Sequence, residues 1–242
     1  GGAGNINLNN TLAVNFSASA NSGTVTLTNT KDITLNGNVT GPAGVTLSTG
    51  AAGTLAIGNN KISTTNSNIV LNADNFTTGA KGSINAGTAT AILTPATLTN
   101  NVTVGGFVPF KNIVAGTVQV GNNVNYTGNI TVGANLTTTA NLNFFNTGTG
   151  TFTNNAIITA TGKTVNVNTG SDISNAAAGN IDVGAAGSVN LTSANGNIGS
   201  GTAINTNAGT LSASIAGGAG NINLNNTLAV NFSASANSGT VT

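Results

Sequence analysis

The sequence predicts an all-β chain folded as a parallel β-helix (β-solenoid), with about ten coils in each 216-residue repeat. Three observations support this prediction: a long internal repeat, apolar residues that alternate along many short segments, and a composition with very little charge. Together they predict stacked coils around a narrow core of Val, Ile and Leu, closed by short turns.

The first observation is a repeat that links the two ends of the chain. Residues 1–26, GGAGNINLNNTLAVNFSASANSGTVT, recur letter for letter as residues 217–242. Self-similarity at a fixed period is typical of proteins built from stacked units. We therefore expect residues 1–216 to be one full solenoid repeat and residues 217–242 to start the next, in a chain that continues in both directions. The alternative is an artificial duplication.

Short segments with period-two alternation predict the strands. In GTVTLTNT (residues 23–30), Val25 and Leu27 share one face, and threonines occupy the other. Comparable segments begin at Asp32, Gly44, Asn68, Asn101, Gly116, Asn129, Lys163, Asn180 and Gly187. Each ends in Gly, Asn, Ser or Asp, which tolerate the backbone angles of tight turns. Helical periodicity is absent, so we expect almost no helix.

Two all-β architectures fit such strands: a sandwich or barrel of hairpins, and a parallel solenoid. Hairpin sheets commonly protect their edges with Lys or Pro, and this chain shows no such pattern. Its apolar anchors instead return about every 20 to 25 residues, as at Val25, Val45, Val70 and Ile92, which is the length of one β-helix coil. At the usual strand spacing, ten coils would rise by roughly 48 Å. We expect a right-handed helix, because the hexapeptide pattern of left-handed ones does not appear.

The alternation also predicts which side chains form the core. Six residues near the N-terminus are expected to point inward: Val25, Leu27, Ile33, Leu35, Val45 and Leu47. Asn and Thr side chains should align into ladders that hydrogen-bond from coil to coil. The two copies of the repeated segment should share one backbone arrangement, displaced along the axis by about ten strand spacings.

The composition argues against several classes of function. Charged residues are 4% of the chain, and a net charge of +1 offers no electrostatic footprint for nucleic acid or an anionic membrane. No segment approaches the ~20 apolar residues of a membrane-spanning helix. Cys, His, Glu and Arg are absent, so neither a disulfide framework nor a transition-metal site is expected. The sequence therefore predicts no cofactor, no metal, no nucleic-acid partner and no membrane insertion of this segment.

The acidic side chains do not suggest an enzyme. Polysaccharide cleavage on a β-helix needs paired carboxylates, or a basic residue at a calcium site. The four aspartates, Asp32, Asp74, Asp172 and Asp182, are scattered along the sequence. Asp172 and Asp182 are separated by about half a coil, so they should not share a face. No catalytic residue is predicted, and glycine-rich segments are interpreted as turns rather than phosphate-binding loops.

Longer strings share a rhythm with one group of exported proteins. Examples are KDITLNGNVTGPAGVTLSTG (31–50), GSINAGTATAILTPATLTNNVTVGG (82–106) and NGNIGSGTAINTNAGTLSAS (195–214). The chain resembles the repetitive passenger regions of filamentous-haemagglutinin-like exoproteins of Gram-negative bacteria, and autotransporter passengers are similar. The resemblance implies a right-handed β-helix, export to the cell surface or medium, and an adhesive or structural role in a filament. The partners it implies are further copies, end to end or side by side, and the surface of a host or neighbouring cell.

Ligand binding remains an alternative to a purely structural role. Threonine-rich outer faces are compatible with binding ice or carbohydrate, although other residues interrupt the threonine rows. Asn-X-Ser/Thr triplets are frequent, as at Asn38 and Asn129, and are compatible with surface glycosylation or with composition alone.

The few aromatic residues predict a lateral contact. Phe144 and Phe145 are adjacent, and Phe107 and Phe110 flank Pro109. Neighbouring side chains in a strand point to opposite faces, so Phe144 and Phe145 cannot both enter the core unless the chain bends. An outward Phe would recur once per repeat and could hold two filaments side by side. We therefore predict a lateral contact at Phe144, Phe145, Phe107 and Phe110.

Overall fold

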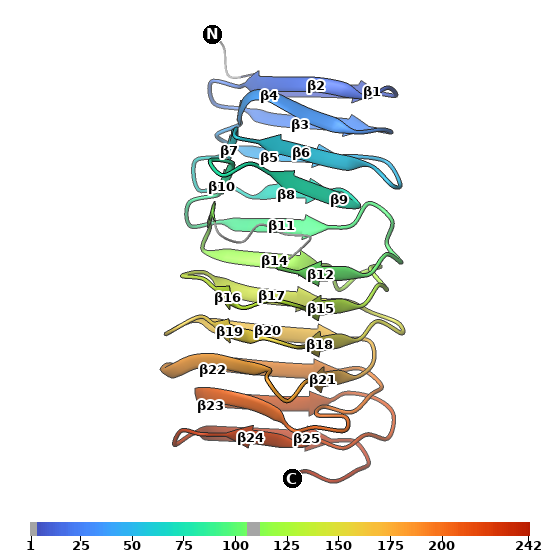
Figure 1. The fold of residues 1–242 in the computed structure, drawn as a ribbon, viewed down its shortest axis with the longest axis vertical. Helices are drawn as coiled ribbons and strands as arrows, with labels where there is room; N and C mark the ends of the chain where they lie inside the picture. Colours follow the sequence, from blue (N-terminus) through green and yellow to red (C-terminus); the bar gives the residue numbers. More distant parts are fainter. Residues whose placement is uncertain (1–3, 106–111) are drawn as a thin grey trace. The chain divides into compact units, whose positions relative to one another are not determined.

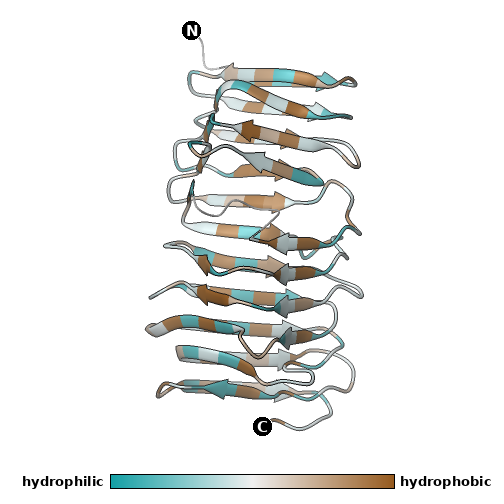
Figure 2. Ribbon diagram, in the orientation of Figure 1, coloured by the Kyte–Doolittle hydropathy of each residue, from teal (hydrophilic) through white to brown (hydrophobic). Residues whose placement is uncertain are grey.

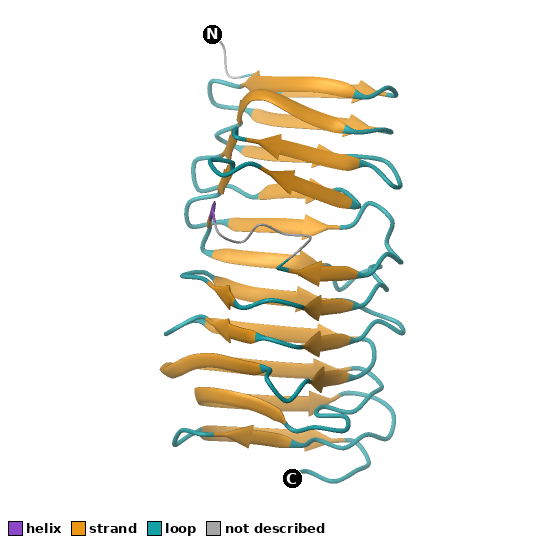
Figure 3. Cartoon of the chain, viewed as in Figure 1, coloured by secondary structure: helices purple, strands orange, loops and turns teal. Residues whose placement is uncertain are grey.

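The computed structural model describes residues 4–105 and 112–242. Apart from a helical turn at Asn112, every regular element in these ranges is a β-strand (Figure 3). All the strand pairs found there are parallel. The chain forms two compact units, Gly1–Leu98 with Phe107–Gln119, and Thr99–Gly106 with Val120–Thr242. Each unit is a parallel β-solenoid, which confirms the predicted fold class.

In the first unit, each coil adds one strand to a long sheet and returns through strands of a second sheet (Figure 1). The long sheet stacks β1 (Ile6–Asn10), β3 (Thr24–Asn29), β5 (Gly44–Ser48), β8 (Ile69–Asn72) and β11 (Thr90–Thr94). The return strands are β2 (Val14–Ser19), β4 (Ile33–Thr40), β6 (Thr54–Gly58), β7 (Lys61–Ser63), β9 (Asn75–Thr78), β10 (Ser83–Asn85) and β13 (Ile113–Val114). Val25 pairs with Val45, Val45 with Ile69 and Ile69 with Ala91, so successive anchors are separated by one coil of the predicted length. The predicted anchors Val70 and Ile92 are wrong by one residue. They pair with each other on the outer face, because Ile69 and Ala91 occupy the core side of these strands.

The second unit has the same design, with three rows of strands. One row holds β17 (Asn141–Phe145), β20 (Thr164–Thr169) and β25 (Asn231–Ala236), together with the later parts of β22 (Asn180–Ser193) and β23 (Ile204–Ile215). A second row holds β12 (Val102–Val104), β15 (Ile130–Val132), β18 (Phe152–Asn154) and β21 (Ile173–Asn175), then single bridges at Ile198, Ile222 and Val241. The third row holds β16 (Leu136–Thr137), β19 (Ile157–Thr159), the first residues of β22 and β23, and β24 (Leu224–Asn226).

The number of coils also follows from these rows. The long sheet of the first unit stacks five strands, and the equivalent row of the second unit stacks five more, β17, β20, β22, β23 and β25. The remaining strand, β14 (Thr117–Gly121), lies in sequence at the boundary of the two units. The two units together therefore contain about ten turns, as the sequence predicts.

Alternating side chains build the core of each coil. All six core residues predicted near the N-terminus are buried: Val25, Leu27, Ile33, Leu35, Val45 and Leu47. Figure 2 shows the same alternation along the strands as brown and teal bands. Burying one such side chain stabilises the fold by about 1.5–3 kcal/mol, so the stacked apolar columns supply most of the driving force for coiling.

Asparagines form a ladder on the outer face of the second unit, as the sequence predicts. The side-chain Nδ2 of Asn166 donates to Asn143 Oδ1 at 2.8 Å, and Nδ2 of Asn190 donates to Asn166 Oδ1 at 2.8 Å. The hydroxyl of Ser212 continues the column by donating to Asn190 Oδ1 at 2.8 Å. The bonds follow the register of β17, β20, β22 and β23, so they join successive coils outside the core.

The two copies of the repeated segment do not share one backbone arrangement. In the first copy, Ile6 and Leu8 belong to one strand, β1, and both pair with β3. In the second copy their equivalents separate: Ile222 bridges to Val241, whereas Leu224 lies in β24 and pairs with β23. Both copies keep the pairing between this Ile and the Val near the end of the segment. They also keep the hydrogen bond in which the Asn before the Ile accepts from the backbone N–H of the Thr before the Val. The expectation of one shared backbone is therefore wrong, because the first copy pairs with strands that follow it and the second mainly with the preceding strand β23.

Candidate functional site

The adjacent phenylalanines of β17 point to opposite faces. Phe144 is fully buried, and its ring centroid lies 5.2 Å from that of Phe152 at an interplanar angle of 40°. Phe145 lies on the outer face and is half-buried. Phe107 and Phe110 lie outside the described residues. The structure thus leaves Phe145 as the outward aromatic of the pair, and the lateral contact itself remains a prediction.

The backbone around Phe145 is closely packed on one side. Gly121 lies against it with φ +74°, and a Cβ added there would come within 2.2 Å of the Phe145 carbonyl oxygen. The positive φ and the close approach both require glycine at this position. On the other side, Asn168 is the register partner of Phe145. The ring therefore stands on a strand whose backbone is fixed by both neighbouring coils.

The outer face beside Phe145 carries amides and hydroxyls but no charge. The column next to it is the asparagine ladder of Asn143, Asn166 and Asn190. The column that contains Phe145 continues with Asn168, Thr192 and Ser214. A half-buried aromatic ring beside planar amides can make apolar and hydrogen-bonding contacts with a flat partner, and it offers no group for acid–base chemistry.

A second recurring device fixes the corners of the coils. Asn101 Oδ1 accepts a hydrogen bond from the backbone N–H of Asn129 at 2.9 Å, and Asn129 Oδ1 accepts one from Thr151 N–H at 3.0 Å. Each side chain thus holds the backbone of the next coil, 22 to 28 residues later. This hydrogen bond between coils was not predicted from the sequence. The pattern that could have indicated it is the Asn or Asp that precedes or begins many of the predicted strands, at the same spacing as the coils.

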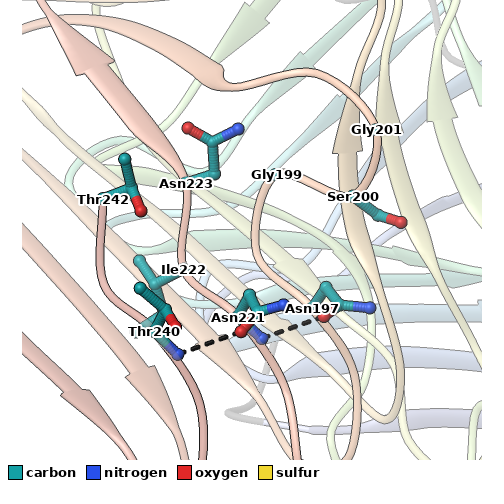
Figure 4. A pocket seen from close by; sticks show the side chains of 9 residues that line it. All are labelled: Asn197, Gly199, Ser200, Gly201, Asn221, Ile222, Asn223, Thr240 and Thr242. Atoms are coloured by element: carbon teal, nitrogen blue, oxygen red, sulfur yellow. Dashed lines mark hydrogen bonds between the residues drawn. The ribbon is translucent and has the colours of Figure 1, made fainter.

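The corner bonds also line an open groove in the second unit (Figure 4). Backbone N–H groups of Asn221 and Thr240 donate to Asn197 Oδ1 and Asn221 Oδ1, both at 2.9 Å. The groove has a volume of about 430 Å³ and is lined by Asn197, Gly199, Ser200, Gly201, Asn221, Ile222, Asn223, Thr240 and Thr242. None of these residues is charged, and two of its amide oxygens already bind backbone.

All four aspartates act as acceptors within the scaffold. Their partners are backbone N–H groups or asparagine amides of neighbouring coils, at 2.6–2.8 Å: Thr54 for Asp32, Ala52 and Thr97 for Asp74, Asn197 for Asp172 and Asn207 for Asp182. No cluster of three or more His, Cys, Asp or Glu that could hold a metal ion occurs in residues 4–105 and 112–242. The carboxylates therefore serve the same corner and ladder contacts as the asparagines.

The single tyrosine is a structural donor. Tyr126 is fully buried, and its hydroxyl donates to the carbonyl oxygen of Asn100 at 2.9 Å. Burial raises the pKa of the Tyr126 hydroxyl, because the anion would lose its hydration. Gly128 leaves room for this contact, since an added Cβ would meet both the Asn100 oxygen and the tyrosine hydroxyl.

The structure and the comparisons give no further pointer to a ligand. In the part of the chain that the structure describes, no helix is long and apolar enough to cross a membrane. Comparisons with protein-family models, with curated proteins and with solved structures found no match to this chain.

Proposed function

We propose that this chain is part of a structural and adhesive filament at a bacterial surface, built from tandem 216-residue solenoid units. The observation that carries the proposal is the continuity of coil-to-coil bonding. Parallel backbone pairing, the outer asparagine ladder and the corner asparagines all join each coil to the next. Such columns transmit tension along the axis, which is what a filament needs.

The repeated segment supports the tandem part of the proposal. Both copies form solenoid coils, and both keep one Ile–Val pairing, Ile6 with Val25 in the first copy and Ile222 with Val241 in the second. A second copy that continues the coiling is what an array of units requires. The proposal has no catalytic step, because the four aspartates already serve the scaffold.

Low charge supports the adhesive and extracellular parts. Five lysines and no arginine leave few sites for trypsin-like proteases, and uncharged contacts depend little on salt. The absence of cysteine suits export, since no wrong disulfide can form outside the cell. The resemblance to exported filament proteins points the same way.

Carbohydrate binding is the second candidate, and the outer face of β17 favours it. Phe145 stands beside the amides of Asn143 and Asn168, a combination that suits the apolar face and the hydroxyls of a sugar ring. Ice binding has less support. The outward column of Asn7, Thr26 and Thr46 continues with Val70 and Ile92, so its threonine row spans only two coils.

Chains of one, two and four covalently joined 216-residue units test the filament proposal. Electron microscopy should show rods whose length grows by roughly 48 Å with each added unit. The same chains, attached to beads, should bind cell surfaces more strongly as the unit number rises. Separate globules joined by linkers would contradict the filament. Rods that bind one glycan class on an array, and lose it in Phe145→Ala, would favour the carbohydrate alternative.

The lateral contact has its own test. Phe145→Ser should leave the rod folded and reduce side-by-side bundling, because the ring is outward and half-buried. Ile157→Ser is the matched control, since Ile157 is also an outward apolar side chain, 42% exposed. Bundles that survive Phe145→Ser, or that both variants disrupt equally, would show that Phe145 does not join the filaments.

A further inference from the structure

Two asparagines lie inside the core of the second unit, where the preceding coils place valine. In the second row, Val104 pairs with Val132, Val132 with Asn154, and Asn154 with Asn175. Both valines and Asn154 are fully buried, and Asn175 is 6% exposed. The other inward column of these four strands contains apolar side chains alone. A pair of amides in consecutive coils therefore interrupts an otherwise apolar core.

Each of the two amides uses one end to hold backbone groups nearby. Asn154 Oδ1 accepts a hydrogen bond from the backbone N–H of Ala156 at 3.4 Å. Asn175 Nδ2 donates to the carbonyl oxygen of Gly179 at 2.8 Å and to that of Ala203 at 3.4 Å. These contacts fix the direction of both amides. Turning the Asn154 amide over would bring two donors together at Ala156, and turning Asn175 over would bring two acceptors together at Gly179.

The other end of each amide has no partner within the protein. Among the described residues, Asn154 Nδ2 and Asn175 Oδ1 are buried side-chain atoms that make no hydrogen bond. One atom is a donor and the other an acceptor, and they belong to register partners in adjacent coils. Native proteins rarely leave buried polar groups unpaired, so these two atoms indicate a missing partner between β18 and β21.

The backbone around the pair is fixed and closes it off from solvent. The backbone N–H of Ala176 donates to the carbonyl oxygen of Asn154 at 2.9 Å, and Gly179 N–H donates to Ala176 O at 2.9 Å. A Cβ added at Gly179 would lie 2.3 Å from both Asn154 O and Asn175 Oδ1, so this turn packs directly against the two asparagines. A partner that reaches both amides must therefore be very small.

The chemistry of the two atoms selects the partner. A metal cation needs oxygen ligands and gains nothing from an N–H donor, and an anion would be repelled by the Asn175 oxygen. Water can accept from the first atom and donate to the second, and buried water molecules commonly join such groups.

We infer that one water molecule is bound inside this coil, where it accepts a hydrogen bond from Asn154 Nδ2 and donates one to Asn175 Oδ1. It joins β18 and β21 from within the core. The hydroxyls of Thr153 and Ser174 join the same two strands directly on the outer face, at 3.0 Å. This site goes beyond the proposed filament function and does not depend on it.

A crystal structure of the 242-residue chain, at a resolution that shows ordered water, tests the inference directly. We expect one density peak at roughly 2.7–3.2 Å from both Asn154 Nδ2 and Asn175 Oδ1. The peak should disappear in Asn154→Leu, because leucine fills a similar volume but offers no donor. It should persist in the matched control Asn166→Leu, which changes an asparagine of the outer ladder. No peak in the unsubstituted chain, or a direct hydrogen bond between the two amides, would overturn the inference.

Urea unfolding of single and double variants gives a second test in solution. Asn154→Leu and Asn175→Leu should each raise the equilibrium constant for unfolding by at least about tenfold, because each leaves the opposite amide and the water short of a partner. The double variant should raise it by less than the product of the two factors, since its second substitution removes a group that has already lost its partner. Asn154→Leu combined with Asn166→Leu should instead give the full product. A full product for the Asn154 and Asn175 pair, or an Asn154→Leu chain that is more stable than the unsubstituted one, would contradict a bridging water.

Discussion

Two identical copies of one sequence, residues 1–26 and 217–242, lie in this chain, and the structure treats them differently. Phe16 is 6% exposed, whereas its equivalent Phe232 is 50% exposed. Val25 is fully buried, whereas Val241 is 42% exposed. In the first copy, Phe16 pairs with Leu35 of β4, and Val25 pairs with Ile6 on one side and Val45 on the other. In the second copy, Phe232 pairs with Leu211 and Val241 with Ile222, each on one side of its coil. Burial in this fold is therefore set by the neighbouring coil as much as by the residue.

The hydrogen bonds of the two copies differ in the opposite sense, because the second copy makes more of them at the equivalent asparagine. In the second copy, Asn226 makes four hydrogen bonds: it donates to the carbonyls of Ala208 and Leu228 and accepts from Thr206 Oγ1 and Ala208 N–H. In the first copy, its equivalent Asn10 donates to Leu12 O and to Asn29 Oδ1. The second copy is thus not simply looser. Its apolar side chains are less buried than those of the first copy, whereas its Asn226 makes more hydrogen bonds with the preceding coil.

The largest expected contrast is a charge at the equivalent valines. Val25→Asp places a carboxylate between Ile6 and Val45 in the core, so we expect the free energy of unfolding to fall by about 4 kcal/mol or more. Val241→Asp should cost less than about 1 kcal/mol, because its side chain reaches solvent. Urea unfolding followed by circular dichroism measures both. Equal losses would show that Val241 is as buried as Val25.

A smaller contrast is expected at the equivalent phenylalanines. Phe16→Ala leaves a cavity against Leu35 and should cost about 3 kcal/mol, whereas Phe232→Ala should cost about 1 kcal/mol. The same unfolding measurement applies. A larger loss at Phe232 would reverse the comparison and point to a cover that the structure does not contain.

The smallest expected contrast is at the equivalent asparagines, where the substitution in the second copy should cost more stability than the one in the first. Asn226→Ala should destabilise the chain by about 1–2 kcal/mol, because it leaves backbone groups of the preceding coil without partners. Asn10→Ala should cost about 0.5 kcal/mol, since it removes fewer hydrogen bonds. Thermal melts of the two variants measure the difference. If Asn10→Ala proved the costlier change, the polar half of the comparison would be wrong.

The fold class and the core were predictable from local pattern. Alternation alone placed Val25, Leu27 and the four other predicted core residues inside, because side chains of a strand point to opposite faces wherever the strand pairs. It misplaced the anchors Val70 and Ile92 by one residue, since a strand of consecutive apolar residues does not mark its inner face. The same rule predicted that the adjacent side chains of Phe144 and Phe145 point to opposite faces of their strand. Ladders of asparagine were predictable in kind, since identical side chains stack when coils stack.

The row that each segment occupies was not predictable from local pattern. Ile6 and Ile222 have identical sequence neighbours until the chain ends, yet only Ile6 continues into a strand that also contains its Leu. Leu224 lies in another row because it pairs with β23, and nothing within the repeated segment itself indicates this long-range pairing. Corner bonds such as Asn101 to Asn129 were missed for a similar reason, because they join residues 28 positions apart.

One measurement tests most directly whether the neighbouring coil decides burial. The chain has no cysteine, so Val25→Cys and Val241→Cys each create a single thiol at equivalent positions. We expect the thiol at position 25 to react with a labelling reagent at least about 100-fold more slowly than the one at 241. Adding residues 27–50 after Thr242 should slow the reaction at 241 toward the rate at 25, because a following coil then covers it. Equal rates in the 242-residue chain, or an unchanged rate at 241 after the addition, would contradict this account.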